Sequence, residues 1–330
     1  MILASSILEE RGDRLRMLAS DDTLTARSLV APLFVTDGND PPVEIPSLPG
    51  MQRLNISDTL RECETLTGLG IRAVALFPVI ADEYKDHTAT YALREDGLFP
   101  RILRALQDAH PQLILIADVA LDPYSTHGHD GLLNAQGEVM NDPTVAHLSK
   151  LAVLLAQAGA GVVAPSDMMD GRVRSIRNAL NSSGCHTTSI LSYAAKFASA
   201  FYGPFRDAVS SSQKTYLDKR TYQLDPANAS QAIRDALLDV EEDADALMVK
   251  PAGLYLDIIA RLRERTTLPL AAYQVSGEYA QIHAATRTGW LNLDRARDES
   301  LAAIRRAGAD FILTYFAREA ASALLQRSAA

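Results

Sequence analysis

The sequence predicts an α/β protein in which eight parallel strands alternate with helices and close into a (β/α)8 TIM barrel. Eight short apolar runs recur along the chain, and successive runs leave room for a helix between them. Most of the runs are apolar throughout, as expected of parallel strands that are covered on both faces. The alternative is a doubly wound sheet, but no Gly-x-Gly-x-x-Gly follows any run, so a dinucleotide site is not indicated.

The apolar runs give the positions of the expected strands. These are Leu29–Val35, Ala73–Val79, Leu113–Val119, Gly161–Ala164, Ser189–Tyr193, Ala246–Lys250, Leu270–Val275 and Phe311–Tyr315. Helical spacing that ends at or near glycine predicts helices over Ser57–Leu69, Pro143–Ala158, Ser230–Val240 and Ser300–Ala307.

Two segments fall outside this alternation. Residues 1–28 are polar and irregular, and we expect them to form an N-terminal arm or cap before a barrel domain of residues 29–330. The segment Tyr202–Thr221 is rich in Ser, Lys and Asp and follows the fifth expected strand. Its length predicts a lid over the end of the barrel.

Composition narrows the class of protein. A chain of 330 residues that is 47% hydrophobic can bury a large core, and barrels of this size are commonly one domain. The net charge of -9, with scattered basic residues, does not favour nucleic acid or an anionic membrane as a partner. No window approaches the roughly 20 apolar residues of a membrane span, and Met1–Leu8 is too short for a signal peptide. We therefore expect a cytoplasmic protein.

The two cysteines, Cys63 and Cys185, lie far apart and form no Cys-x-x-Cys pair. This spacing excludes a disulfide framework and makes a cysteine zinc site an unfavoured interpretation. Two reduced thiols in a cytosolic protein are the expected reading.

Ionisable side chains follow the expected strands at their C-terminal ends, where (β/α)8 barrels carry their chemistry. From the third strand to the eighth, these positions hold Asp118, Asp122, His127, His129 and Asp130; Ser166; Tyr193 and Lys196; Lys250; Tyr273 and Ser276; and Tyr315. Nothing in the chain matches a nucleophile elbow or a phosphate-binding loop.

Two of these residues are lysines beside apolar runs. Lys250 closes the run Ala-Leu-Met-Val, and Lys196 follows Tyr-Ala-Ala. Loss of solvation and a second ammonium nearby both lower the pKa of a lysine, and the neutral amine can then attack a carbonyl and form a Schiff base. The alternative for each is a structural lysine that is ion-paired or extends its head to solvent.

The stretch Asp118–Asp130 is rich in Asp and His and has two interpretations. Two histidines spaced i, i+2 with flanking carboxylates could bind a divalent ion. Equally, His127 and His129 could fix a tight loop by hydrogen-bonding its backbone. Spacing alone leaves both open.

At these residues the sequence resembles the porphobilinogen synthase (5-aminolevulinate dehydratase) family. The resemblance runs from about Leu29 to Leu324. Its longest segments are Asp118-Val-Ala-Leu-Asp-Pro-Tyr124, His127-Gly-His-Asp-Gly131, Ala164-Pro-Ser-Asp-Met-Met-Asp-Gly-Arg172, Tyr193-Ala-Ala-Lys196, Phe201-Tyr-Gly-Pro-Phe-Arg-Asp-Ala208, Met248-Val-Lys-Pro251 and Tyr273-Gln-Val-Ser-Gly-Glu-Tyr279.

The resemblance implies the condensation of two 5-aminolevulinate molecules to porphobilinogen, with loss of two waters, in tetrapyrrole (heme) biosynthesis. It implies Schiff bases on Lys250 for the first substrate and on Lys196 for the second. Ser276 and Tyr315 would hold the first carboxylate, and Arg206, Lys219 and Gln223 the second. Asp118, Asp122 and Asp130 would orient the amine or carry protons. Ser166, Tyr193 and Tyr273 would complete the pocket.

The departures from the family pattern concern metals and assembly. Zinc-using members carry three cysteines at the positions of Ala120, Asp122 and Asp130, so the resemblance implies the zinc-independent branch. Those carboxylates would hold Mg2+, a monovalent cation or only water. The family's stimulating Mg2+ site maps to Asp235, and no organic cofactor is implied. The family also implies a homo-oligomer, although Ala19-Ser-Asp-Asp22 replaces an arginine-rich run of the arm.

Two other functions remain open from the sequence. One is a related Schiff-base aldolase that acts on another keto acid. The other is a catalytically silent or specialised paralogue that serves as a binding or regulatory subunit. The retained carboxylate ligands argue against the first. The retained lysine pair argues against the second, because a silent copy has no chemical need for two desolvated amines.

Overall fold

The computed structural model describes residues 24–209 and 218–329. It confirms the expected barrel. Eight parallel strands pair in the order in which they occur along the chain, and β10 closes the ring on β1. They are β1 (Leu29–Thr36), β4 (Ala73–Val79), β5 (Ile114–Val119), β6 (Val162–Pro165), β7 (Ser189–Lys196), β8 (Ala246–Lys250), β9 (Leu270–Gln274) and β10 (Phe311–Thr314).

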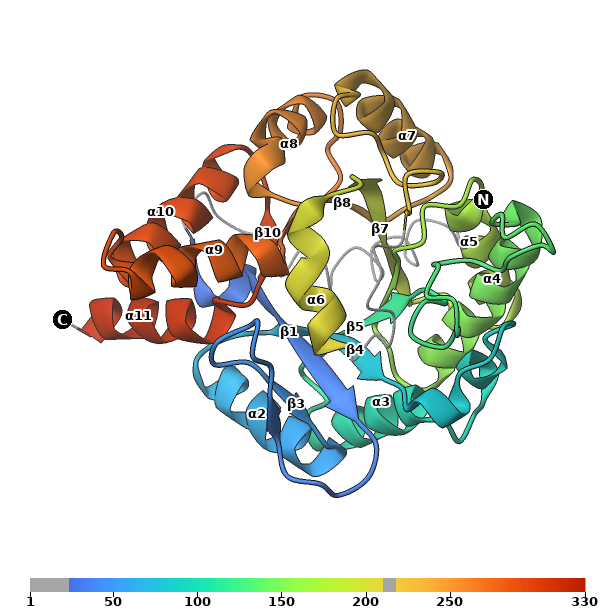
Figure 1. The fold of residues 1–330 in the computed structure, drawn as a ribbon, viewed down its shortest axis with the longest axis horizontal. Helices are drawn as coiled ribbons and strands as arrows, with labels where there is room; N and C mark the ends of the chain where they lie inside the picture. The colour runs from blue at the N-terminus through green and yellow to red at the C-terminus, as the bar shows by residue number, and fades with distance from the viewer. Residues whose placement is uncertain (1–23, 210–217, 330) are drawn as a thin grey trace.

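Helices surround this ring (Figure 1). They are α2 (Ile56–Gly68), α3 (Leu98–Ala109), α4 (Asn141–Gln157), α5 (Arg172–Ser182), α7 (Ala229–Glu241), α8 (Leu256–Arg263), α9 (Ser276–Arg287), α10 (Leu293–Arg306) and α11 (Ala317–Ala329). A small hairpin, β2 (Val43–Glu44) and β3 (Gln52–Leu54), adds to the edge of β1 and was not expected. Among the described residues, no helix reaches the length and apolarity that crossing a membrane requires.

The expected helices are confirmed, with one shifted boundary. The last of them begins at Leu293 rather than Ser300, because Asn292 caps it through the backbone N–H of Arg295. Its first two turns are Arg- and Asp-rich and show no apolar periodicity. The predicted arm falls mostly on residues 1–23, outside the described part of the chain, and residues 24–28 lead through a short 3-10 helix into β1.

Successive side chains of a strand point to opposite faces, so the core consists of one cluster inside the barrel and one between the strands and the helices. Ile114 and Ile116 belong to a cluster inside the barrel, whereas Leu115 and Ala117 pack outward against the helices. The interior cluster ends in aromatic side chains near the C-terminal ends of the strands, among them Tyr193 and Tyr273. Lys250 lies two residues after Met248, which belongs to the interior cluster, so the Lys250 side chain also faces the inside of the barrel.

A bulge in β7 interrupts the alternation of inward and outward side chains at one point. Between Ser192 and Ala195 the register against β8 shifts, so that three steps along β7 match two along β8. Ala194 and Ala195 both pack outward, and the next residue, Lys196, pairs with Lys250. The bulge absorbs the extra residue and so keeps Lys196 level with Lys250 on the neighbouring strand, about 4.8 Å away.

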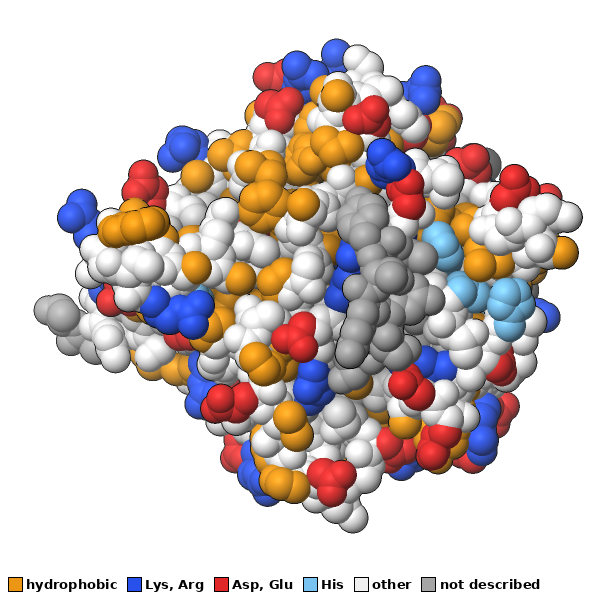
Figure 2. Space-filling view, in the orientation of Figure 1, with side chains coloured by type: hydrophobic (Ala, Val, Ile, Leu, Met, Phe, Trp, Pro, Cys, Tyr) orange, Lys and Arg blue, Asp and Glu red, His pale blue; other side chains and the backbone are white. Residues whose placement is uncertain are grey.

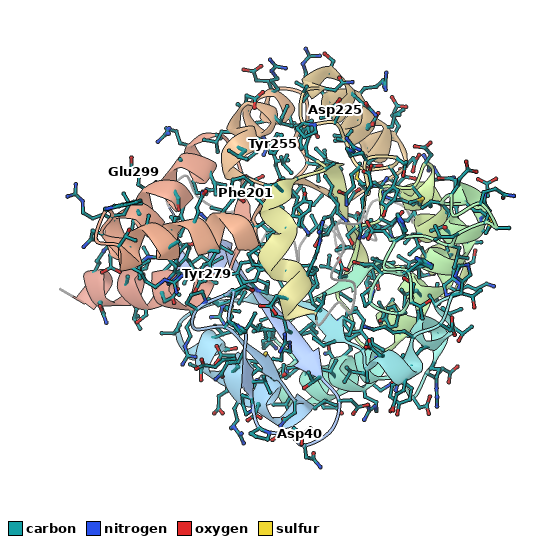
Figure 3. All side chains as sticks on the ribbon, viewed as in Figure 1. Asp40, Phe201, Asp225, Tyr255, Tyr279 and Glu299 are labelled. Carbon is teal, nitrogen blue, oxygen red and sulfur yellow. The ribbon has the colours of Figure 1, made fainter. Side chains whose placement is uncertain are left out.

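A short helix, α6 (Gly203–Ala208), crosses the mouth of the barrel and rests against α9 (Figure 1). The segment before it, which carries Phe201 (Figure 3), approaches the start of α9 closely. A Cβ at Gly277 would lie 2.6 Å from the Phe201 carbonyl oxygen, so this contact requires glycine. Together with residues 210–217, which lie outside the described residues, α6 belongs to the segment that the sequence predicts as a lid.

Closure of the barrel depends on β10, so truncating a buried side chain of β10 should destabilise the whole fold. Ile312 is fully buried and pairs with Leu29 across the closure. We expect Ile312→Ala to lower the free energy of unfolding by about 2–5 kcal/mol, measured by urea denaturation. Leu238→Ala, at a side chain that is 47% exposed, should change it by less than about 0.5 kcal/mol. Equal effects of the two variants would contradict this account.

Candidate active site

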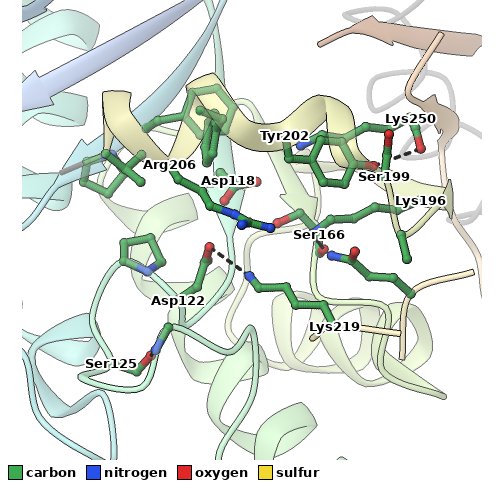
Figure 4. Close-up of a pocket in the computed structure, with 18 of the residues that line it drawn as sticks. Asp118, Asp122, Ser125, Ser166, Lys196, Ser199, Tyr202, Arg206, Lys219 and Lys250 are labelled. Atoms are coloured by element: carbon green, nitrogen blue, oxygen red, sulfur yellow. Dashed lines mark hydrogen bonds and ion pairs between the residues drawn. The ribbon is translucent and has the colours of Figure 1, made fainter. Parts of the chain in front are cut away.

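One pocket at the C-terminal ends of the strands collects much of the predicted site (Figure 4). The site residues expected from the sequence that line it are Asp118, Asp122, Ser166, Lys196, Arg206, Lys219, Gln223 and Lys250. They come from β5, β7, β8 and α6, from the loops after β5 and β6, and from the lid segment and the residues just after it. Segments that lie far apart in the sequence therefore converge on one cavity, as the barrel topology requires.

Lys250 is enclosed by aromatic rings. Its Nζ lies 4.6 Å from the ring centroid of Tyr273, 5.1 Å from that of Tyr193 and 5.4 Å from that of Phe205. Burial, and then the neighbouring Lys196 ammonium, lower the pKa of Lys250 from 10.5 to about 7. A substantial share of neutral amine is therefore present at neutral pH, which is the form that attacks a carbonyl.

Lys196 has a different environment. Its ammonium donates to Asp130 Oδ2 at 3.1 Å and to the Ser166 carbonyl oxygen at 2.5 Å. Asp130 is 1% exposed and lies beneath the pocket rather than in its lining. The two lysines thus stand side by side, one ion-paired and the other in an aromatic enclosure.

The three carboxylates also differ. Burial, followed by the charge of Asp122, raises the pKa of Asp118 to about 7, so this carboxyl can both accept and donate a proton near neutrality. Burial alone would raise the pKa of Asp130 as well, but the ammonium groups of Lys196 and Lys219 lower it. Asp130 is therefore a fixed negative charge between two cations.

Lys219 forms ion pairs with both Asp122 and Asp130. Its Nζ lies 2.6 Å from Asp130 Oδ1 and 3.5 Å from Asp122 Oδ2. Although burial would lower it, these two carboxylates raise the pKa of Lys219. The Asp122 and Asp130 oxygens that the metal hypothesis needs are thus already neutralised by an ammonium. In residues 24–209 and 218–329, no group of three or more His, Cys, Asp or Glu side chains is arranged to hold a metal ion.

Ser276 and Tyr315 lie behind α6 rather than in the pocket lining. The Ser276 hydroxyl accepts the N–H of Phe205 at 3.0 Å and donates to the Phe201 carbonyl at 3.2 Å. The Tyr315 hydroxyl pairs with that of Tyr273 at 3.0 Å. For Ser276 to bind a substrate carboxylate, it must exchange these partners on α6 and the segment before it.

The histidines of the loop after β5 make the hydrogen bonds that the loop-fixing interpretation expects. His127 Nδ1 accepts the N–H of His129 at 3.1 Å, and its Nε2 lies 3.2 Å from the His87 carbonyl oxygen. His129 Nδ1 lies 3.1 Å from the Tyr222 hydroxyl. Histidine side chains gather beside the barrel mouth in Figure 2. Burial lowers the pKa of His127 to about 4, so the neutral ring makes these contacts at neutral pH.

Asp235, the expected Mg2+ ligand, lies on α7 outside the pocket lining. Its carboxylate accepts from Gln231 Nε2 at 3.3 Å and from Arg234 Nε at 3.4 Å. These neighbours supply a cation and an amide but no further carboxylate, so Asp235 as a magnesium ligand stays a prediction.

Several pocket residues were not expected from the sequence. Lys85 follows β4, and Tyr202 and Phe205 flank the start of α6; all three line the pocket. The rule that chemistry follows the strand ends would have led to Lys85, had it been applied to the second strand. No periodicity marks Tyr202, whose hydroxyl donates to the Phe197 carbonyl at 2.7 Å.

Glu278 is a buried positioning residue that sequence reasoning noted without a role. Its Oε2 accepts the N–H of Val275 at 2.7 Å, and its Oε1 accepts that of Gly253 at 2.5 Å. Burial raises the pKa of Glu278 to about 7, against the effect of these N–H groups. The carboxylate thereby ties the loop that follows Lys250 to the start of α9, beside Ser276.

The lowered pKa of Lys250 leads to a pH-dependence prediction. Trapping of a keto acid on Lys250 by cyanoborohydride, followed by peptide mass spectrometry, should rise with pH through about 7 as the neutral amine increases. Lys196→Met removes the neighbouring ammonium and leaves Asp130 with Lys219 as its remaining ammonium partner. Both changes raise the Lys250 pKa, so the midpoint of the trapping profile should move to higher pH. A midpoint that stays in place would contradict the proposed coupling.

Comparison with known proteins agrees with this geometry. A family model for delta-aminolevulinic acid dehydratase matches residues 9–323. The delta-aminolevulinic acid dehydratase of Chlamydia pneumoniae is 50% identical over 303 residues, covering 92% of this chain and 91% of that protein. That of Bradyrhizobium diazoefficiens is 47% identical over 309 residues, covering 94% and 87%. A crystal structure of the Toxoplasma gondii enzyme in complex with its reaction product porphobilinogen superposes with a TM-score of 0.90 at 49% identity, covering 94% of this chain and 88% of that one. The chain is therefore a member of the delta-aminolevulinic acid dehydratase (porphobilinogen synthase) family.

Proposed function

We propose that this protein is a porphobilinogen synthase that joins two 5-aminolevulinate molecules through Schiff bases on Lys250 and Lys196. The observation that carries the proposal is the pairing of Lys196 on β7 with Lys250 on β8. The β7 bulge places these two lysines side by side in one pocket. A Schiff-base aldolase needs one such lysine, and a silent paralogue needs neither. Two adjacent amines suit a reaction that activates two ketones.

The chemistry follows from the two environments. Neutral Lys250 attacks the first ketone and releases water. Lys196 forms the second imine once its proton has passed to a base, and Asp118, whose carboxyl can exchange protons near neutrality, is the carboxylate suited to accept it. One imine loses a proton to give an enamine. The enamine carbon attacks the imine carbon of the other substrate, and this forms the carbon–carbon bond. The free amine of one substrate closes the ring and both lysines are released, so the net loss is two waters.

Positioning of the two substrates is the second part of the proposal. Arg206 and Lys219 supply cations for the second carboxylate, and guanidinium groups suit carboxylates through two parallel hydrogen bonds. Holding both substrates in one pocket turns a bimolecular encounter into an intramolecular step. Asp118, with its pKa near 7, is the proton carrier of this scheme.

We also infer that catalysis does not use zinc. The chain has two cysteines, and neither Cys63 nor Cys185 lines the pocket. Asp122 and Asp130 face Lys219, and every step above proceeds on lysine and carboxylate groups. The cytoplasmic location and the homo-oligomeric state expected from the sequence stay predictions.

Product formation is the first test of this function. We expect the purified protein to convert 5-aminolevulinate to porphobilinogen, measured colorimetrically, and to keep this activity in EDTA. Lys250→Ala and Lys196→Ala should abolish it, whereas Lys150→Ala, at an exposed position on α4, should not. Mg2+ that stimulates the wild type but not Asp235→Asn would support the Mg2+ prediction. A folded protein that gives neither product nor a borohydride-trapped lysine would refute the enzyme and favour the silent paralogue.

The role of Asp118 can be tested separately. Asp118→Asn should lower kcat by about 10²–10⁴-fold, because an amide cannot carry the proton, while substrate is still trapped on Lys250. Asp170→Asn, at an exposed position of the next loop, should leave kcat unchanged. Wild-type kcat in Asp118→Asn would remove this residue from the mechanism.

A further inference from the structure

Lys85 is a pocket residue whose position the scheme above leaves unexplained. It lies in the connection between β4 and α3, directly after the 3-10 helix Asp82–Tyr84, and lines the same pocket as Lys196 and Lys250. Its side chain is only 9% exposed. Fixing and burying a lysine side chain costs up to about 2 kcal/mol of conformational entropy, so its placement needs a compensating interaction.

The backbone holds Lys85 against the loop that carries Asp122. Asp86 N donates to the Tyr124 carbonyl at 3.2 Å, and Thr126 N donates to the Asp86 carbonyl at 3.1 Å. Asp86 and Ser125 thereby form a parallel bridge next to Lys85. Ser125 and Thr126 both line the pocket, so Lys85 is fixed beside pocket residues on the Asp122 side.

The carboxylate partner of Lys85 is Asp82, which does not line this pocket. Lys85 Nζ lies 2.8 Å from Asp82 Oδ1, and the Asp82 side chain is 68% exposed. An ion pair with an exposed carboxylate is weak, at about 0–1 kcal/mol. Lys219, by contrast, is paired with buried Asp130 inside the site. Lys85 is thus a mostly buried cation that lines the pocket and whose carboxylate partner is readily exchanged.

We propose that Lys85 is a substrate-binding residue that exchanges Asp82 for the carboxylate of an incoming keto acid. An ammonium has three donors, so it can pass from one carboxylate to the other without being left unpaired. Asp82 then competes with the substrate carboxylate and holds the Lys85 ammonium in place while the pocket is empty. The inference rests on the proposed function, because it takes the ligand to be 5-aminolevulinate.

The two members of this pair make opposite predictions. Lys85→Gln should raise KM for 5-aminolevulinate about tenfold, with kcat within about twofold, because a charge-assisted contact to substrate is lost. Asp82→Asn should lower KM about twofold, because the competing carboxylate is removed. Lys85→Arg should keep KM within about threefold of wild type. If Lys85 only braced the loop through Asp82, then Lys85→Gln and Asp82→Asn would act alike, and that result would overturn the proposal.

A matched control lies in the same connection. Arg94 and Asp96 form an exposed ion pair at 2.7 Å, and neither lines the pocket. Arg94→Gln and Asp96→Asn should therefore leave KM unchanged. A fall of KM in Asp96→Asn equal to that in Asp82→Asn would mean a general effect of loop charge and would also overturn the proposal.

Each variant is assayed both for porphobilinogen and for the 5-aminolevulinate concentration at half-maximal borohydride trapping. Trapping without product would refute the proposed condensation, yet the shift of the half-maximal concentration in Lys85→Gln would still test Lys85. Product in the wild type with an unshifted Lys85→Gln would refute the Lys85 proposal alone. A wild type that neither traps nor turns over 5-aminolevulinate would refute both.

Discussion

The chemistry of this protein depends on the desolvation of one ammonium group. Lys250 is enclosed by the rings of Tyr193, Tyr273 and Phe205, and Lys196 lies on the neighbouring strand. Both features disfavour a charge on Lys250, and a nucleophilic amine results without any added base. Such an enclosure exists only because eight strands close into a ring whose upper interior is aromatic.

The acids around this centre keep the pair of lysines unequal. Asp130 lies against Lys196 and Lys219, whereas Asp118 is buried with its pKa near 7. One carboxylate therefore stays charged and orients cations, while the other can exchange protons. If both lysines were ion-paired to a buried carboxylate, both would be held in the protonated form, which cannot attack a ketone. The asymmetry lets one amine react before the other.

The eight strands could be predicted because buried parallel strands are apolar along their whole length, and strand order then gathers Asp118, Ser166 and Lys250 at one end. Other features have no local signature. The polar first turns of α10 show no apolar period. The β7 bulge and the ion pair of Lys196 arise from contacts with distant strands and loops. Ser276 lies against the α6 region rather than in the pocket lining, and its hydrogen bonds there could not be derived from its own strand.

The bulge in β7 also has a consequence for how such barrels change over time. If the same residues continued as a regular strand, Ala195 would face inward, Lys196 would fall on the outward face, and only Lys250 would remain inside. Deletion of Ala194 or Ala195 would remove the irregularity and still leave Lys196 inside, whereas insertion of one residue beside them would turn it outward. The length of this core strand therefore decides how many molecules the pocket can activate.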